Sequence, residues 1–345
     1  HGWDQQIRKE YTDWVWSDGS HPSIVIWDAI NENWDDFIGN ELIPELMELD
    51  PTRIWDAGYM TAEQLKRGLD EMDEPHPYEG PMPWIDANKY KSEPYPLGNL
   101  DYRNQKNIES IESSAAQLVN EYGWIWLWRN GQPAKLTVDV YKHYLGEHAT
   151  AEKRRSLQAY WLQAETEWLR SIREHAGVLA FCHLTNNYGY TGDWFINDIA
   201  DLEPGPAMHW FRHAFAPAAV FINLTDERYT KFTEPHLAGS ELLFTLVGIN
   251  DQTQPVRGEV QLKLYDHQGK VVWQKDTKTE LPTDIQKEIP ILLTLPEVAG
   301  GYTLAAEFYA ETQTKPVISR RYIKVGQPDE YKYFELKPEK IDKNL

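Results

Sequence analysis

Two glutamates follow or end apolar runs, and this placement suggests chemistry by a carboxylate pair. The apolar run 23–30 reads as a buried strand and is followed by Asn31 and Glu32. A second apolar run, 117–122, contains Glu121 near its end. The carboxyl ends of the strands of a parallel barrel gather on one face. Two carboxylates across a pocket can protonate a glycosidic oxygen and attack the anomeric carbon or activate water. The two glutamates are therefore candidate catalytic groups for glycoside hydrolysis.

The flanks of both glutamates make the pattern more specific. A lone Asn-Glu or Glu-Tyr-Gly means little, because most glutamates are solvated surface groups. Here the chain reads His-Pro-Ser-Ile-x-x-Trp-x-x-x-Asn-Glu from His21 and Glu-Tyr-Gly-Trp from Glu121. Over roughly residues 10–216 it resembles glycoside hydrolase family 2 and its relatives in clan A. The resemblance implies retaining hydrolysis on a (β/α)8 barrel with immunoglobulin-like domains around it.

The resemblance also implies roles for individual residues. Glu32 is expected to be the general acid/base after the fourth barrel strand, protonated in the free enzyme. Glu121 is expected to be the ionised nucleophile after the seventh strand. Asn31 is expected to bond the sugar 2-hydroxyl. His76 and Tyr78 match the end of the sixth strand, where an aromatic hydroxyl often contacts the nucleophile, and both are expected to touch substrate. A retaining enzyme needs its carboxyl groups about 5 to 5.5 Å apart.

The segment after the eighth strand departs from the family pattern. Relatives usually carry a Trp-rich segment there, which lines the subsite for the cleaved sugar. This chain reads Phe-Cys-His-Leu-Thr-Asn-Asn-Tyr over 181–188. We expect His183, Asn186 or Trp194 to take over stacking or hydrogen bonding to substrate.

The chain is rich in aromatic side chains, with 15 Trp, 19 Tyr and 10 Phe. Indole faces stack on sugar rings and indole N–H groups bond hydroxyls, whereas a Trp-rich core is the alternative for any single Trp. Trp124, Trp126 and Trp128 alternate, so in an extended stretch they share one face. Packing and sugar stacking both remain open there, and Trp124 is a candidate for substrate binding.

The apolar pattern changes near residue 216. Before it, strand candidates alternate with helical spacing, which indicates parallel β/α units. The strand candidates are 23–30, 53–59, 71–78, 117–122 and 177–184, and the helix candidates are 5–16, 41–49, 61–69 and 151–176. After it, about seven short strands over ~110 residues fit an immunoglobulin-like sandwich. These strand candidates are 218–224, 241–250, 258–265, 271–274, 286–295, 302–309 and 317–325. We therefore predict an α/β barrel part over 1–216, an all-β sandwich over 217–326 and a polar tail over 327–345.

The predicted barrel is incomplete in this chain. The fourth strand starts near residue 23, after a single helix, so only strands four to eight are present. Five strands cannot close an eight-stranded barrel, and an open parallel sheet leaves unpaired edges. We expect another chain, or the rest of a longer protein, to supply the missing strands.

Composition excludes several classes of partner and cofactor. The chain has 34 basic and 54 acidic residues, a net charge of −20, which argues against nucleic acid and anionic membranes. No apolar run approaches the roughly 18 residues that span a bilayer. The single Cys182 excludes an intrachain disulfide and a Cys-based zinc site. No catalytic metal spacing or phosphate-binding loop is present, so no cofactor is predicted. The first residue is His, no signal peptide is visible, and a periplasmic or secreted location is favoured over the cytoplasm.

The leading hypothesis is an exo-acting retaining β-glycosidase whose partner is a carbohydrate substrate. β-Galactosides, β-glucuronides and β-mannosides all fit this scaffold. A carbohydrate-binding protein on a degenerate barrel is one alternative. Another is a C-terminal part of an enzyme that is inactive without its missing half.

Overall fold

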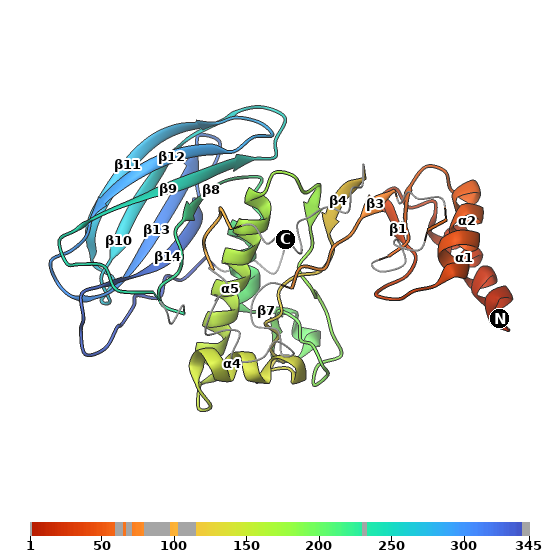
Figure 1. Ribbon diagram of the computed structural model, residues 1–345, viewed down its shortest axis with the longest axis horizontal. Helices are drawn as coiled ribbons and strands as arrows, with labels where there is room; N and C mark the ends of the chain where they lie inside the picture. Colours follow the sequence, from red (N-terminus) through yellow and green to blue (C-terminus); the bar gives the residue numbers. More distant parts are fainter. Residues whose placement is uncertain are drawn as a thin grey trace. The chain divides into compact units, whose positions relative to one another are not determined.

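The computed structural model describes residues 2–58, 65–66, 71–78, 97–102, 115–229 and 233–339. The chain forms two compact units (Figure 1). Unit 1 comprises His1–Pro77, Arg103–Tyr122 and Glu174–Leu179. Unit 2 comprises Tyr78–Tyr102, Gly123–Arg173 and Ala180–Leu345. No helix in the described ranges is both long and apolar enough to cross a membrane.

Unit 1 contains five short parallel strands in two sheets. Strand β1 (Ile26–Asp28) pairs with β2 (Ile54–Asp56). Strand β4 (Ala116–Val119) lies between β3 (Met72–Asp73) and β5 (Gly177–Val178). The predicted parallel strands therefore exist, but they have two to four residues each instead of the six to eight predicted. The ladder pairing covers only part of each apolar run, and the remainder leads into loops. The described residues do not form a closed barrel.

Aromatic packing holds the N-terminal part of unit 1 together. Helix α1 (Asp4–Asp18) places Trp14 edge-on against Trp27 of β1, which in turn stacks on Trp55 of β2 at 5.7 Å. The indole N–H of Trp27 donates to Asp50 Oδ2 at 3.0 Å. The predicted helix 41–49 starts earlier, as a π-helical turn η1 (Ile38–Leu42) that runs into α2 (Ile43–Leu49). The helix predicted over 61–69 lies almost entirely outside the described residues.

Helix α5 (Ala151–Ser171) is the main helix of unit 2. The Thr150 hydroxyl caps it by accepting from the Lys153 N–H at 3.3 Å. From Leu157 to Leu169 every residue is buried, so the helix is covered on all sides. The predicted helix 151–176 is five residues too long, because Ile172 leaves helical geometry and the chain enters β5 at Gly177.

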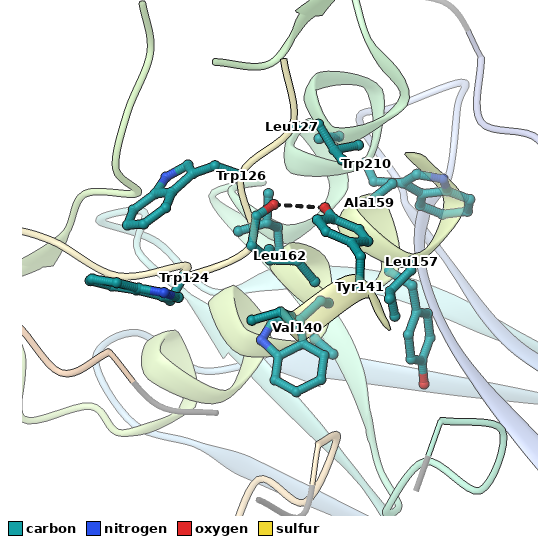
Figure 2. Close-up of a cluster of buried hydrophobic side chains, with 14 of the residues drawn as sticks. Trp124, Trp126, Leu127, Val140, Tyr141, Leu157, Ala159, Leu162 and Trp210 are labelled. Atoms are coloured by element: carbon teal, nitrogen blue, oxygen red, sulfur yellow. Dashed lines mark hydrogen bonds between the residues drawn. The ribbon is translucent and has the colours of Figure 1, made fainter. Parts of the chain in front are cut away.

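Several short elements of unit 2 were not predicted. These are η4 (Lys135–Thr137), α4 (Val138–Leu145), β6 (Phe195–Ile196), η5 (Ile199–Asp201), β7 (Glu203–Pro204) and α6 (Pro206–Ala214). Helices α4, α5 and α6 contribute to one aromatic core with the chain around Trp126 (Figure 2). In this core the Tyr141 hydroxyl donates to the Ile125 carbonyl at 2.9 Å.

The seven predicted C-terminal strands form two antiparallel sheets that enclose one apolar core (Figure 1). The first sheet has the order β12-β9-β8 and the second β11-β10-β13-β14. The strands are β8 (Ala218–Asn223), β9 (Glu241–Asn250), β10 (Val256–Tyr265), β11 (Val271–Leu281), β12 (Lys287–Thr294), β13 (Gly300–Ala310) and β14 (Val317–Val325). Strand β11 is longer than the predicted 271–274, because its polar continuation pairs with β10 along a solvent-exposed edge.

The described part of the polar tail, residues 327–339, packs on the sandwich. The Thr303 hydroxyl donates to the Phe334 carbonyl at 2.8 Å, and the Tyr322 hydroxyl donates to Glu335 at 3.0 Å. Glu335 also forms an ion pair with Arg228 at 2.5 Å. These bonds hold the described part of the tail against the sandwich.

Candidate active site

Unit 1 brings the two predicted catalytic glutamates together. Glu32 lies four residues after the end of β1, and Glu121 lies two residues after the end of β4. Carboxylate oxygens of the two residues and a ring nitrogen of His76 all lie within 4.8 Å of one another. The sequence predicts this pair although its members lie 89 positions apart in the chain, and the geometry makes a joint role in one reaction feasible.

His76 bridges the two carboxylates. Its Nδ1 lies 2.9 Å from Glu32 Oε1 and 3.5 Å from Glu121 Oε2. The ring is almost fully buried, with its side chain 2% exposed. Because a single ring nitrogen faces both acids, its hydrogen bond can serve only one of them fully at a time. His76 therefore couples the hydrogen bonding of the two glutamates.

The two carboxylates differ in accessibility. The Glu32 side chain is 44% exposed and its residue has a left-handed φ of 43°. The Glu121 side chain is 13% exposed. A non-glycine residue with positive φ is uncommon, and such positions cluster at functional sites. The neighbouring Asn31 is exposed. The accessible carboxylate is thus Glu32, and the enclosed one is Glu121.

Behind this pair lies a second group of carboxylates that the sequence analysis did not identify. Asp28, Asp56 and Glu74 offer oxygens within 4.8 Å of one another. The parallel register places Asp28 opposite Asp56 at the ends of β1 and β2, and Glu74 follows β3 directly. Register neighbours project to the same face of a sheet. No sequence motif encodes this contact, because it depends on how the strand ends align.

Asn120 links the second group to the catalytic pair. Its Nδ2 donates to Glu74 Oε2 at 2.6 Å and lies 3.5 Å from Asp28 Oδ2. Burial raises the pKa of Asp28, although the Asn120 amide and His76 act in the opposite direction. Glu74 Oε1 also lies 4.0 Å from His76 Nε2. Asn120, the residue before Glu121, therefore connects Glu74 and Asp28, and Glu74 in turn faces Nε2 of His76.

In each of the two side-chain clusters the potential ligand atoms lie close enough together to bind a divalent cation. One consists of Glu32, His76 and Glu121, and the other of Asp28, Asp56 and Glu74. Hard divalent cations such as Mg²⁺ and Ca²⁺ take oxygen ligands. Close carboxylates can equally share a proton or accept hydrogen bonds, as Asn120 donates here. The absence of a catalytic metal stays a prediction.

The remaining predicted substrate-binding residues lie in unit 2. Tyr78 packs edge-on against Trp124, with ring centroids 4.9 Å apart. The Trp124 N–H donates to the Leu136 carbonyl at 3.2 Å, and the Trp126 N–H donates to the Phe181 carbonyl at 2.7 Å. Both indoles are buried (Figure 2). For Trp126 the structure favours packing over sugar stacking. Trp124 has one face against this core, so its predicted contact with substrate stays a prediction.

The loop after β5 carries His183, Asn186 and Trp194. His183 and Asn186 are exposed, whereas Trp194 is buried. The His183 ring lies edge-on to Trp194 at 6.3 Å. The Trp194 indole nitrogen is buried and donates to no acceptor among the described residues. His183 and Trp194 thus lie together, and their contact with a sugar stays a prediction.

Asp193, next to Trp194, forms a buried ion pair that the sequence did not reveal. Its carboxylate is fully buried and forms an ion pair with Arg129, with Nη2 and Oδ2 2.5 Å apart and Nε 3.1 Å from Oδ2. It also accepts from the backbone N–H groups of Thr185 and Phe195. The Asp193 carboxylate therefore holds the backbone at Thr185 and Phe195, on either side of the stretch that carries Asn186.

Comparisons with known proteins support this fold. Residues 244–315 match the family model of the mannosidase Ig/CBM-like domain. The β-D-mannosidase of Dictyoglomus thermophilum superimposes with a TM-score of 0.62 at 16% identity, over 97% of this chain and 42% of that chain. The exo-chitosanase CsxA of Amycolatopsis orientalis gives a TM-score of 0.54 at 12% identity, over 93% of this chain and 38% of that chain. No curated protein matches at a significant level.

The two solved structures are much longer than this chain, which spans 42% and 38% of them. At these identities the likeness concerns the fold. It extends over the parallel strands of unit 1 as well as the sandwich, since more than nine-tenths of this chain is covered in both comparisons. Over more than nine-tenths of its length the chain therefore shares the fold of the corresponding parts of these two solved structures, and its sandwich matches the mannosidase Ig/CBM-like domain.

Proposed function

We propose that the chain is the part of a retaining β-glycosidase that carries both catalytic carboxylates. The observation that carries the proposal is the meeting of Glu32 and Glu121 on the single nitrogen of His76. Their oxygens lie within 4.8 Å, which suits the ~5 to 5.5 Å separation of carboxyl groups in retaining enzymes rather than the ~6.5 to 9.5 Å of inverting ones. The similarity in fold to a β-mannosidase and an exo-chitosanase supports a carbohydrate substrate.

The mechanism has two steps. Protonated Glu32 donates its proton to the glycosidic oxygen while ionised Glu121 attacks the anomeric carbon, so the leaving alcohol departs and a glycosyl ester forms. Glu32, now ionised, removes a proton from water, which attacks the same carbon and frees Glu121. The greater exposure of Glu32 suits its contact with leaving group and water.

His76 holds the two carboxylates in the geometry that both steps need. When Glu32 bears the proton, its hydroxyl can donate to Nδ1, and the Nε2–H then points to Glu74. When Glu32 is ionised, a proton on Nδ1 can be donated to it. Asn120 fixes Glu74 by donating to it at 2.6 Å. Glu74 thereby orients the imidazole, as second-layer groups commonly do for catalytic side chains.

We further propose that the catalytic barrel is completed by strands outside this chain. Strand β1 pairs only with β2 among the described residues. Val25, which directly precedes β1, is exposed, and so are Trp3 and Trp16 at the two ends of α1. Unpaired strand edges and exposed large apolar side chains favour contact with further polypeptide. The missing strands would come from the rest of a longer protein or from another chain.

The test replaces each glutamate in the native particle that contains this chain. Glu121→Gln should abolish turnover of aryl β-glycosides with little change in thermal stability, because the nucleophile is lost while its volume is kept. Glu32→Ala should slow substrates with poor leaving groups by about 10² to 10⁴-fold. Azide should partly restore its activity on substrates with good leaving groups, giving glycosyl azide with retained configuration.

Asp13, an exposed acid on α1 of unit 1, provides a matched control. Asp13→Asn should keep full activity. Turnover by Glu121→Gln close to the unsubstituted level would contradict the proposal. A particle that binds glycosides but hydrolyses none would instead favour the alternative of a carbohydrate-binding protein on a degenerate barrel.

A further inference from the structure

The loop that follows β5 presents two tyrosines to solvent. Tyr188 is 59% exposed and Tyr190 is 66% exposed. Both lie in unit 2, between the exposed Asn186 and the buried Asp193. Neither tyrosine belongs to the carboxylate site described above. We call Tyr188 and Tyr190 together the tyrosine platform.

The backbone beneath these two rings is firmly held. The indole N–H of Trp128 donates to the Gly189 carbonyl at 3.1 Å, and the Lys135 backbone N–H donates to the same oxygen at 3.4 Å. The Leu136 N–H donates to the Tyr190 carbonyl at 3.1 Å. A loop with this many bonds to its neighbours holds its side chains in place before any ligand arrives.

The same loop adopts a costly conformation. Asn187 and Tyr188 have left-handed φ values of 57° and 56°. Asn tolerates this region, but a bulky aromatic residue seldom occupies it. The Asn187 side chain accepts from the Arg129 N–H at 3.2 Å, and the Arg129 guanidinium donates to the Thr185 carbonyl at 2.7 Å. These bonds hold the strained backbone in place. Strained residues that are held by their surroundings are typical of functional loops.

The surroundings of the rings suit a sugar. The Trp128 ring meets Tyr188 edge-on at 5.3 Å, and the Lys135 ammonium lies 5.1 Å from the centre of the Tyr190 ring. Flat aromatic faces can take the C–H face of a pyranose, and the ammonium, the phenol hydroxyls and the exposed Asn186 amide can bond its hydroxyls. A rigid aromatic side chain loses little conformational entropy on binding. Polar groups around small aromatic faces fit an oligosaccharide better than an apolar protein surface.

The position of the loop in the chain points to the same ligand. It follows the carboxyl end of β5, a parallel neighbour of the strand that precedes Glu121. In barrel enzymes, loops after the carboxyl ends of strands contact substrate. We propose that the tyrosine platform binds pyranose units of an oligosaccharide. This inference rests on the proposed function, because a glycosidase acts on carbohydrate ligands.

Binding to the full 345-residue chain tests the tyrosine platform without requiring turnover. The probes are β-1,4-linked mannotetraose and a glucosamine tetramer, with the corresponding monosaccharides for comparison, measured by isothermal titration calorimetry. At least one tetramer should bind, and more tightly than its monosaccharide. Tyr188→Ala and Tyr190→Ala should each weaken tetramer binding about two- to twelvefold, since an aromatic contact contributes about 0.5 to 1.5 kcal/mol. Tyr188→Phe and Tyr190→Phe should keep affinity within about twofold, because the ring face remains.

Trp16→Ala is the matched control, because Trp16 is a comparably exposed aromatic residue on α1 in unit 1. It should leave the affinity unchanged. Circular dichroism should show that all variants stay folded. Absence of tetramer binding by the unsubstituted chain up to millimolar concentrations would overturn the inference. Unchanged affinity in the Tyr188→Ala/Tyr190→Ala double variant would also overturn it, as would an equal loss in Trp16→Ala.

The outcome is separable from that of the proposed function. Glu121→Gln should still bind the tetramer through the tyrosine platform, because that substitution removes a nucleophile and not a stacking surface. Tetramer binding that depends on both tyrosines, in a native particle without hydrolysis, would contradict only the proposed function. The reverse outcome would contradict only the inference. In it, hydrolysis needs both glutamates, but substitution of the two tyrosines leaves the tetramer affinity unchanged.

Discussion

At the scale of single residues, His76 is the side chain on which the candidate site depends. It is buried, it reaches both Glu32 and Glu121 through one nitrogen, and its other nitrogen faces Glu74. The motifs predict the two glutamates and place His76 among the substrate-binding residues. The structure adds a bridging contact between them. A histidine that contacts both carboxylates must accommodate each change in their protonation during a two-step reaction.

The second group of carboxylates, Asp28, Asp56 and Glu74, could not be predicted in the same way. Asp28 and Asp56 each end a short strand, and in a single sequence they look like any polar residue after an apolar run. Only the register that pairs β1 with β2 brings them together. Glu74 joins them because β3 ends one residue before it. Contacts of this kind follow from strand alignment and not from spacing along the chain.

Two buried titratable residues of unit 2 should give opposite dependences of stability on pH. Burial, helped by Arg212 and Arg320, lowers the pKa of His213 from 6.5 to about 4. The unfolded chain therefore binds this proton first, so acidification from pH 6.5 to about 4 removes stability. Burial raises the pKa of Asp226 from 3.8 to about 6. Its folded form binds the proton first, so acidification from about pH 6 to 3.8 adds stability.

Urea unfolding of two variants across this pH range separates the two contributions. Relative to the unsubstituted chain, His213→Gln should gain up to about 3 kcal/mol between pH 6.5 and 4, because each pKa unit corresponds to about 1.4 kcal/mol. Asp226→Asn should lose a similar amount over nearly the same range. Parallel stability curves for both variants and the unsubstituted chain would contradict these two pKa shifts.

At the scale of elements, the strands of the sandwich were predictable and those of unit 1 only in part. Strands β9 and β14 coincide with the apolar and alternating runs 241–250 and 317–325. Long antiparallel strands use most of such a run for pairing. In unit 1 the same kind of run pairs over two to four residues, because its ends lead into loops that carry polar site residues.

Elements defined by distant contacts were the ones the sequence did not reveal. Helix α6 begins at Pro206, a good first helical residue. With nine residues it is too short for a clear apolar period. Helix α5 ends before the predicted residue 176, because the chain passes into unit 1 there. Local pattern indicates that a helix exists, whereas its end depends on what the following residues pack against.

The loop 181–195 should depend on its buried ion pair for stability. Arg129 and Asp193 are both buried, and the carboxylate accepts from two further backbone groups. Asp193→Asn leaves the Arg129 charge buried without its partner, which should destabilise unit 2 by about 3 to 5 kcal/mol. The measurement is urea unfolding of Asp193→Asn, the control variant described next and the unsubstituted chain under one set of conditions.

The exposed ion pair between Arg257 and Glu280 provides the control for this substitution. Glu280→Gln should cost far less stability than Asp193→Asn, because solvent screens an exposed pair. Equal effects of Asp193→Asn and Glu280→Gln would contradict the view that the buried pair anchors the loop.

At the scale of the whole molecule, this chain carries the proposed catalytic carboxylates but spans less than half of the two solved structures that it resembles. The predicted fold of a barrel part followed by a sandwich agrees with the parallel strands of unit 1 and the two sheets of the sandwich. The parallel sheets of unit 1 have open edges, which need further strands to pair with. We therefore expect activity to require the polypeptide that completes the barrel.

Comparison of native and denatured masses tests this expectation. The native particle should contain additional polypeptide, either as a second chain or as a longer version of this one. Val25 and Trp16, both exposed here, should then be protected from oxidative labelling in the native particle, because the added strands cover them. A fully active particle that consists of single copies of these 345 residues would contradict the expectation.

The central claim is that Glu121 becomes covalently glycosylated, and trapping that intermediate tests it most directly. The native particle would be incubated with 2-deoxy-2-fluoro-β-glycosyl fluorides of several sugars and then digested for peptide mass spectrometry. The account predicts time-dependent inactivation by at least one reagent and a single fluoroglycosyl group on Glu121, with none on Glu121→Gln. A label on another carboxylate, or hydrolysis with inverted configuration at the anomeric carbon, would contradict it.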